Sequence, residues 1–504
     1  MKHYFELLDI YEKVRILNSI SGVLYWDMNV VMPSNLDAIN YRSKQFQYIS
    51  QEIHKLITKN KTAELLEKCE KEKSLDKYQR RNVELIRRMY DNRTALTSEL
   101  VGQMSKQSNK TLEIWKKAKV KKDFSIVKAD LEKLFKLNVQ AAELYAEKKE
   151  ISDPFDALID TRDKGFSVSL LSKLFDESKS YLIPLLRKIK NKSETIKDDF
   201  LYREVPKEIQ IKMVNELAKF LEYDISSEKA VGNIAEVEHP LTIGCGYKDV
   251  RVTVKYVENN VLAAFFAGAH ECGHALHGLQ GREEWYNQPI YRISSPSFGE
   301  SQSRFVENMV AGSKDFWGYY FPKLNEQTNV FKDISLDMFY SAINKVKPSL
   351  IRIQADELTY MLHIIIRFEI ERDWFAGKIT TDELPSVWNQ KYDEYLGVEV
   401  TDDSVGVMQD LHWYSQYYGY FFGYGIGDLI ATQLSNSLTK TNPDWNDLLR
   451  EGKFTPIREW LEENVHKKGG LFDCLDLVKN ITGEMLSTKY HQKYLEEKYL
   501  DLYS

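Results

Sequence analysis

The residues with the clearest capacity for chemistry lie in the segment AGAHECGHALHGLQG, residues 267–281, which contains three histidines and a glutamate. His270 and His274 are four residues apart, so on a helix they lie on one face and can bind the same cation. Glu271 follows the first histidine and would lie next to a water on that cation. Two neutral imidazoles with a carboxylate are typical ligands of a catalytic Zn²⁺, which keeps its fourth position for water. The pattern therefore predicts a metal centre on a largely buried helix.

The third metal ligand has to come from another element. A longer pattern with a third histidine would need glycine at 277 and histidine at 280, but His277 and Gln280 stand there. We expect His277 to pack near the site without binding the metal. The best candidate for the third ligand is Glu300, because the turn-rich connection before it predicts a helix, a loop and a returning helix. Glu307 shares a predicted helical face with Glu300 and is the alternative ligand, or an acceptor that fixes the tautomer of a ligand histidine.

Glu271 is the predicted general base. Zinc brings the pKa of a bound water to about 7, and a nearby carboxylate then takes the proton during attack on a carbonyl. The same carboxylate can return the proton to a departing amine. This combination indicates hydrolysis of an amide bond.

The bulk composition indicates a large helical protein. Hydrophobic residues make up 43% of the 504 residues, prolines number only 12, and apolar side chains recur at three- and four-residue steps. We find no repeat and no convincing linker, so we expect one all-α domain over 1–504 with a metal-binding core at about 235–430. A net charge of −6 argues against nucleic-acid binding. Four scattered cysteines, no apolar signal segment and no membrane-length run predict a cytoplasmic protein that does not bind membranes.

One segment alternates as a strand does. In DVRVTVKYV, Asp249 to Val257, valines and a tyrosine face one side, and charged or hydroxyl side chains face the other. Asn259 or Asn260 follows and could cap the histidine-bearing helix. A strand is therefore predicted to lead directly into the metal helix.

The ordered motifs resemble those of the carboxypeptidase Taq family of zinc metallocarboxypeptidases. They run from near the N-terminus to the last hundred residues and comprise Trp26-Asp27 with Met32-Pro33, His239-Pro240, Asp249-x-Arg251-x-Thr253, His270-Glu271 with His274, Glu300-Ser301-Gln302, Ile351-Arg352 with Ala355-Asp356, and Gly406 with Gln409-Asp410 and His412-Trp413. Two departures stand out. Gly299 replaces the family's usual histidine, and Gly419-Tyr420-Phe421-Phe422-Gly423-Tyr424 differs from the usual Gly-Tyr-Phe-Pro-Thr-Tyr.

The resemblance implies a helical zincin with a long central groove, a small sheet beside the metal, and commonly a homodimer. It implies Zn²⁺, with Co²⁺ or Mn²⁺ as possible substitutes, and peptide substrates with a free C-terminus from which single residues are removed. The strand at 249–257 could pair with an extended peptide through its edge.

The resemblance also suggests which side chains contact the substrate. Arg352, held by Asp356 four residues later on one helix face, suits a bidentate grip on the terminal carboxylate, with Arg251 as second choice. His412 and either Tyr420 or Tyr424 are candidates to stabilise the oxyanion of the tetrahedral intermediate. His239 is a weaker candidate for a contact in the groove.

Two alternatives remain open at this point. An endo-acting zinc oligopeptidase would use the same metal geometry but would not need a cation for a free terminal carboxylate. A helical binding protein with a structural metal is disfavoured, since structural zinc is normally closed by four protein ligands.

Overall fold

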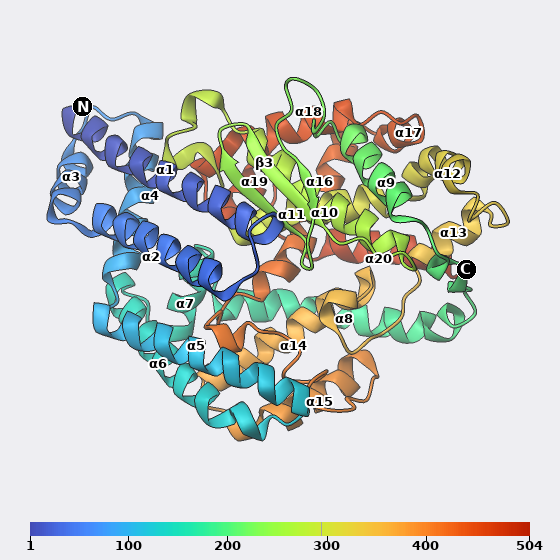
Figure 1. Ribbon diagram of the computed structural model, residues 1–504, viewed down its shortest axis with the longest axis horizontal. Helices are drawn as coiled ribbons and strands as arrows, with labels where there is room; N and C mark the ends of the chain where they lie inside the picture. Colours follow the sequence, from blue (N-terminus) through green and yellow to red (C-terminus); the bar gives the residue numbers. More distant parts are fainter. Residues whose placement is uncertain (294) are drawn as a thin grey trace.

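The computed structural model describes residues 1–293 and 295–504, and helices form most of it (Figure 1). The predicted class, mainly α with a small β-sheet, is confirmed. Of the described helices, none has both the length and the apolar character needed to cross a bilayer.

The N-terminal helices lie together at one end of the molecule (Figure 1). Tyr4, Leu7 and Ile10 pack against Leu65 and Leu66 in a small hydrophobic cluster of their own. The bounds of these helices are α1 (Lys2–Val30), α2 (Leu36–Thr58), α3 (Asn60–Lys71) and α4 (Lys77–Thr94).

A second group of helices follows, and α5 and α6 pack along each other (Figure 1). Lys122 and Glu150, at the C-terminal ends of these two helices, adopt left-handed backbone conformations that stop them. The group comprises α5 (Ser98–Lys121), α6 (Ser125–Lys149), α7 (Pro154–Arg162) and α8 (Val168–Ser193), and the next helix, α9 (Lys207–Phe220), packs instead against α10 (Val261–Leu279).

The sheet has three strands in the order β1-β3-β2: β1 (Ile234–Glu236), β2 (Leu241–Gly246) and β3 (Asp249–Val254). β3 pairs in parallel with β1 and antiparallel with β2, so Val252 has Ile234 on one side and Thr242 on the other. The expectation that this strand offers an edge to a peptide is therefore wrong, because both of its edges are paired. The strand also ends at Val254 instead of Val257.

The reason for the early end is local. The pairing with β1 ends at Val254, whose carbonyl accepts from the backbone N–H of Val237 at 2.9 Å, and the side chain of Gln210 binds the backbone of Val257 instead. Its Nε2 donates to the Val257 carbonyl at 2.9 Å, and its Oε1 accepts from the Val257 N–H at 3.3 Å.

The core around the predicted metal residues is built from α10 (Val261–Leu279), α11 (Pro296–Arg304), the π-helix Phe305–Ala311 and α16 (Phe422–Thr441). α11 packs against both α10 and α16. Ser295 caps α11 by accepting a hydrogen bond from the backbone of Phe298, and Pro296 occupies its first turn. Asn260 precedes α10, but its side chain makes no capping bond.

The rest of the chain surrounds this core. Fifteen of the residues of α14 are buried, which is expected of a helix that is enclosed on all sides. The remaining helices are α12 (Lys314–Thr328), α13 (Leu336–Ile343), α14 (Glu357–Phe375), α15 (Leu384–Leu396), α17 (Trp445–Arg450), α18 (Thr455–Asn464), α19 (Cys474–Thr482) and α20 (Lys489–Leu502).

Candidate active site

His270 and His274 of α10 lie beside Glu300 of α11, and one ligand atom from each falls within 4.8 Å of the other two. His270 Nε2 is 3.8 Å from Glu300 Oε1, and His274 Nε2 is 3.6 Å from Glu300 Oε2. Ligands at about 2.0–2.2 Å from one tetrahedral Zn²⁺ are themselves about 3.4 Å apart. The donor set, two imidazoles and a carboxylate, and its spacing therefore fit a zinc ion.

Two glycines permit this close approach of helices. A Cβ on Gly273 would lie 2.6 Å from the carbonyl oxygen of Gln302, so only glycine lets α10 and α11 pack at this distance. A Cβ on Gly427 of α16 would lie 2.8 Å from Cγ of Glu300. Glu300 is thus held against α16 on one side and aimed at the histidines on the other.

The charge balance of the cluster favours a cation. Burial favours the neutral ring of His270, but Glu300 and Glu307 raise its pKa to about 9. Burial opposes ionisation of Glu300, but His270 and His274 lower its pKa to about 2. Carboxylates that hold a proton this firmly on a ring would also favour a metal ion on it.

Glu307 lies in the π-helix, behind His270. Its Oε2 is 2.8 Å from Nδ1 of His270 and also accepts from Nη1 of Arg304 at 2.8 Å. Arg304 in turn donates from Nε to Asp428 at 2.6 Å. Burial raises the pKa of Glu307, but Arg304 and His270 lower it below its usual value. An ionised Glu307 requires a proton on Nδ1, which leaves the lone pair of His270 on Nε2, toward Glu300.

Glu271 is buried, with 8% of its surface exposed. Thr242 of β2 donates to its Oε2 at 2.5 Å, so the sheet positions this carboxylate. The sequence analysis did not identify Thr242, because it considered only the strand that begins at Asp249. The available signal was a second short strand at residues 241–246, separated from Asp249 by a two-residue turn.

Arg352 is placed differently from the prediction. It lies in a one-turn 3₁₀ helix, and the following Ala355 is extended, so Arg352 and Asp356 do not share a helix face. The predicted bond between them is wrong: Asp356 caps α14 by accepting from the backbone of Thr359 at 3.0 Å. Arg352 donates instead to Asp410, from Nε at 3.1 Å and from Nη2 at 2.9 Å.

Asp410 fixes Arg352 within a larger network. Arg367, fully buried on α14, donates to the other carboxylate oxygen at 2.6 Å. Burial raises the pKa of Asp410, but Arg367 and Arg352 lower it far below its usual range. The guanidinium of Arg352 also lies over the ring of Tyr424 at 5.2 Å. Arg352 is therefore rigidly held and 8% exposed.

The structure brings His412, Tyr420 and Tyr424 together. His412 Nε2 is 3.4 Å from the hydroxyl of Tyr424, and the rings of the two tyrosines are 5.5 Å apart. Burial lowers the pKa of His412 to about 4, so the ring is neutral at neutral pH. The charge of Glu300 contributes to raising the pKa of both tyrosines, after burial, which places them on the side of the metal cluster.

Glu371 anchors the loop that carries these residues. Its carboxylate accepts from Nε1 of Trp413 at 2.7 Å and from the backbone N–H of Gly419 at 3.2 Å. Gly419 has φ +61°, a conformation that favours glycine. Burial raises the pKa of Glu371 to about 8. Nothing in the sequence pattern pointed to this contact across the fold.

The other predicted residues lie at the margin of this arrangement. Arg251 is paired with Asp249 through two bonds of 2.8 Å and lies over the ring of Trp26 at 5.4 Å. His239 is exposed in the bend between β1 and β2. The ring of His277 packs 5.3 Å from that of His466. A Cβ on Gly299 would meet no atom within 4 Å, so space does not require glycine there.

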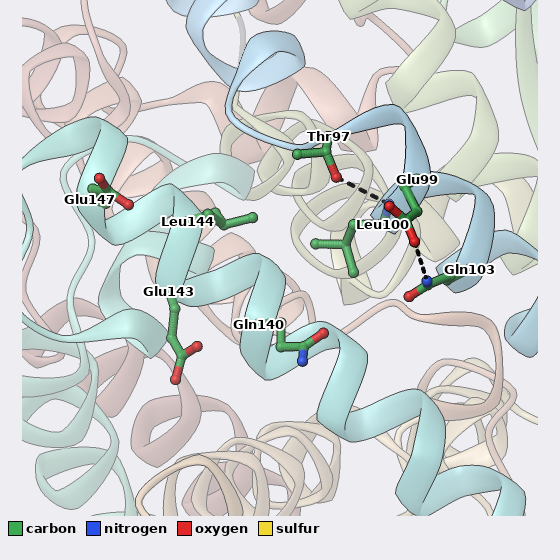
Figure 2. A pocket seen from close by; sticks show the side chains of 8 residues that line it. All are labelled: Thr97, Glu99, Leu100, Gln103, Gln140, Glu143, Leu144 and Glu147. Atoms are coloured by element: carbon green, nitrogen blue, oxygen red, sulfur yellow. Dashed lines mark hydrogen bonds between the residues drawn. The ribbon is translucent and has the colours of Figure 1, made fainter.

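A separate recess of about 450 Å³ lies between α5 and α6 (Figure 2). Three glutamates, Glu99, Glu143 and Glu147, line it, and Glu99 accepts from Gln103 at 3.2 Å. None of its lining residues belongs to the cluster on α10 and α11.

Comparison with known proteins identifies one family that matches nearly the whole chain. The model of the family described as "Carboxypeptidase Taq (M32) metallopeptidase" matches residues 6–499. Carboxypeptidase 1 of Bacillus subtilis is 34% identical, covering 99% of this chain and 98% of its own. Thermostable carboxypeptidase 1 of Thermus thermophilus is 32% identical, covering 99% of each chain.

Solved structures agree with the sequence comparison. The M32 carboxypeptidase from Deinococcus radiodurans R1 superposes with a TM-score of 0.95 at 29% identity, covering 100% of both chains. The carboxypeptidase of Pyrococcus furiosus also gives 0.95 at 29% identity, covering 99% of both chains.

Proposed function

Because this chain belongs to the carboxypeptidase Taq (M32) metallopeptidase family and is a metallocarboxypeptidase, we propose that it uses zinc to release single residues from peptide C-termini. The observation that carries the proposal is the cluster of His270, His274 and Glu300, whose ligand atoms lie within 4.8 Å of one another. The buried carboxylate of Glu271, hydrogen-bonded to Thr242, lies on the same helix as the two histidines.

His270, His274 and Glu300 would hold the ion, with Co²⁺ or Mn²⁺ as possible substitutes. When bound, zinc supplies a Lewis acid that acidifies water and polarises a carbonyl. Glu271 takes a proton from the attacking water and returns it to the leaving amine. Thr242 keeps one carboxylate oxygen of Glu271 in place, and Glu307 keeps His270 in one tautomer.

Residues around the cluster would bind the peptide. Arg352 receives the terminal carboxylate, because it is charged, rigidly held by Asp410 and close to Tyr424. Arg251, which pairs with Asp249 and lies over the ring of Trp26 instead of that of Tyr424, is second choice. His412 and Tyr420 or Tyr424 would donate hydrogen bonds to the oxyanion. His239 remains a weaker candidate for a contact in the groove.

One experiment tests the cofactor and the direction of attack together. The purified protein is analysed for bound metal and then given peptides in pairs, identical except for a free or an amidated C-terminus. We expect about one zinc per chain and products shortened by one residue from the free-terminus peptides only. Cleavage of the amidated partners at internal bonds would indicate an endo-acting oligopeptidase instead, and full activity after removal of the metal would contradict the zinc proposal.

We also propose a cytoplasmic location and a homodimer. The four cysteines are free and buried, as is usual in a reducing compartment. The homodimer rests on the family resemblance, and sedimentation analysis tests it directly.

A further inference from the structure

Two arginines lie near the same tyrosine, Tyr291, beside the C-terminal end of α10. Arg15 is on α1, and Arg292 is in the segment between α10 and α11. The guanidinium of Arg15 lies 4.6 Å from the ring centre of Tyr286 and 5.3 Å from that of Tyr291. The guanidinium of Arg292 lies 6.0 Å from the same Tyr291 ring. The two cations therefore share an aromatic surface.

Within the part of the chain that the structure describes, neither Arg15 nor Arg292 forms an ion pair with an acidic side chain. The Nε of Arg292 is buried with no hydrogen-bond partner, and Nη2 makes only a long contact of 3.5 Å with the carbonyl of Gly278. Burial and the charge of Arg15 lower the pKa of Arg292. The groups that raise this pKa are tyrosines and not carboxylates.

The backbone around Arg292 is shaped to admit its guanidinium. A Cβ on Gly244 of β2 would lie 3.2 Å from Nη2, and a Cβ on Gly278 of α10 would lie 3.6 Å from it. On the outer side, Tyr286 packs 4.5 Å from Tyr247, which is 39% exposed. The nearby Glu283 is exposed, and burial together with the Glu283 carboxylate raises the pKa of Tyr247 to about 12. The pair of arginines thus lies between β2, α10 and the surface.

We propose that Arg15 and Arg292 together bind a small oxyanion. Both arginines are half-buried as residues, but the Nε of Arg292 is buried without a partner. An unsatisfied buried guanidinium nitrogen in a native fold calls for an ion or ligand. The planar fork of arginine matches the oxygens of phosphate, sulfate or a carboxylate better than a spherical ion. The ligand is either a free anion or an acidic side chain of a bound peptide, and both share this chemistry. The proposal does not depend on the hydrolytic mechanism.

Sulfate titration of the metal-loaded protein tests the site. Tm is measured against sulfate concentration at constant ionic strength, with chloride as the balancing anion. We expect a saturable rise in Tm for the wild type, as a ligand that binds only the folded state produces. Arg292→Gln should lose the saturable part. Arg15→Gln should weaken apparent sulfate affinity by roughly tenfold or more, and serves if Arg292→Gln does not fold.

Arg282→Gln is the matched control, because Arg282 also lies over an aromatic ring, that of Trp285, but is paired with Glu284. It should keep the wild-type sulfate response, including the general stabilisation that sulfate gives to any protein. An identical sulfate response in Arg15→Gln and Arg282→Gln would overturn the proposal.

Kinetics identify the source of the anion. Peptides that differ only by Glu or Gln before the cleaved residue are compared in the wild type and in Arg15→Gln. A substrate carboxylate is the ligand if the wild type cleaves the Glu peptide faster than the Gln peptide, sulfate suppresses this preference, and Arg15→Gln lacks it. Equal rates on both peptides, together with saturable sulfate binding, would support a free anion.

Discussion

Glu271 and Thr242 illustrate how single residues determine this site. A carboxylate beside two imidazoles is useful as a base only if its position is maintained, and the hydroxyl of Thr242 contacts it at 2.5 Å. The fold places that hydroxyl from a strand, whereas the histidines come from a helix. The chemistry assigned to Glu271 therefore depends on a contact between two kinds of element.

Glu271→Gln should retain the metal and lose turnover by about 10²–10⁴-fold, since the amide cannot accept the proton of the attacking water. Metal content by elemental analysis and kcat on a free-terminus peptide check this. Glu284→Gln, an exposed neighbour in the following segment, should behave like the wild type. Substantial turnover in Glu271→Gln would remove Glu271 from the role of base.

At the scale of elements, the change from α-helix to π-helix after Arg304 arranges the carboxylates around His270. The π-helix Phe305–Ala311 directly continues α11, so Glu300 and Glu307 approach His270 from consecutive segments with different windings. Such single-turn π segments are rare and often occur at functional sites. Here the segment brings the carboxylate of Glu307 to Nδ1 of His270 while Glu300 faces Nε2.

Glu307→Gln should lower metal affinity by about 10- to 100-fold, because the ligand histidine loses its charged acceptor. Competition with a metal chelator measures the affinity. Glu326→Gln, at an exposed position on α12, is the control. An unchanged affinity in Glu307→Gln would mean that His270 is oriented by packing alone, and complete loss of metal would favour Glu307 as a ligand.

Because Arg352 and Asp356 are not bonded to each other, substitutions at the two positions should have different effects, whereas the sequence predicted related ones. Arg352→Ala should abolish the preference for free over amidated C-termini, because the peptide carboxylate loses its cation. Asp356→Asn should keep that preference and lower stability by about 1 kcal/mol, since Asp356 caps α14 and also accepts from the backbone N–H of Lys347 at 2.9 Å. If Arg352→Ala still prefers free over amidated C-termini, Arg251 becomes the candidate for binding the terminal carboxylate.

At the scale of the whole molecule, the large core encloses several histidines that remain neutral. Burial lowers the pKa of His277 and His491 to about 3 and that of His412 to about 4. Burial also lowers the pKa of His363 and that of His466 well below the usual value. In the unfolded chain each of these rings takes up a proton near pH 6.5. Each ring therefore contributes to a loss of stability in acid.

His491 allows this effect to be isolated, because it lies far from the metal in sequence and accepts or donates one bond of 2.7 Å with Tyr181. Its native pKa is depressed, so below pH 6.5 the unfolded chain binds the extra proton and the free energy of unfolding falls by about 1.4 kcal/mol per pH unit. His491→Gln should lack this contribution. Urea unfolding between pH 7 and 5 should therefore show a stability difference between wild type and variant that shrinks as pH falls.

His54→Gln, at an exposed position, is measured in parallel as the control for removing a histidine. A stability difference between wild type and His491→Gln that stays constant from pH 7 to pH 5 would mean that His491 does not titrate on unfolding as proposed.

The sequence by itself determined the helical class, the family motifs and the candidate metal residues of α10, because these depend on periodicity and short spacings that a local chain segment encodes. His270, Glu271 and His274 share one helix, so their proximity follows from the repeat of that helix. The partners of these residues depended on tertiary structure. Asp410 for Arg352, Thr242 for Glu271 and Glu371 for Gly419 are contacts between distant segments, and no local pattern specifies them.

Failures of the sequence interpretation have the same origin. Asp356 stands four residues after Arg352, but an extended residue between them breaks the helix that the spacing assumed. The alternation of residues 249–257 predicted a strand correctly, yet strand order is set by pairing with β1 and β2 and not by alternation. Local periodicity predicts which face of a helix or strand a side chain occupies. The residue that it contacts is determined only by tertiary packing.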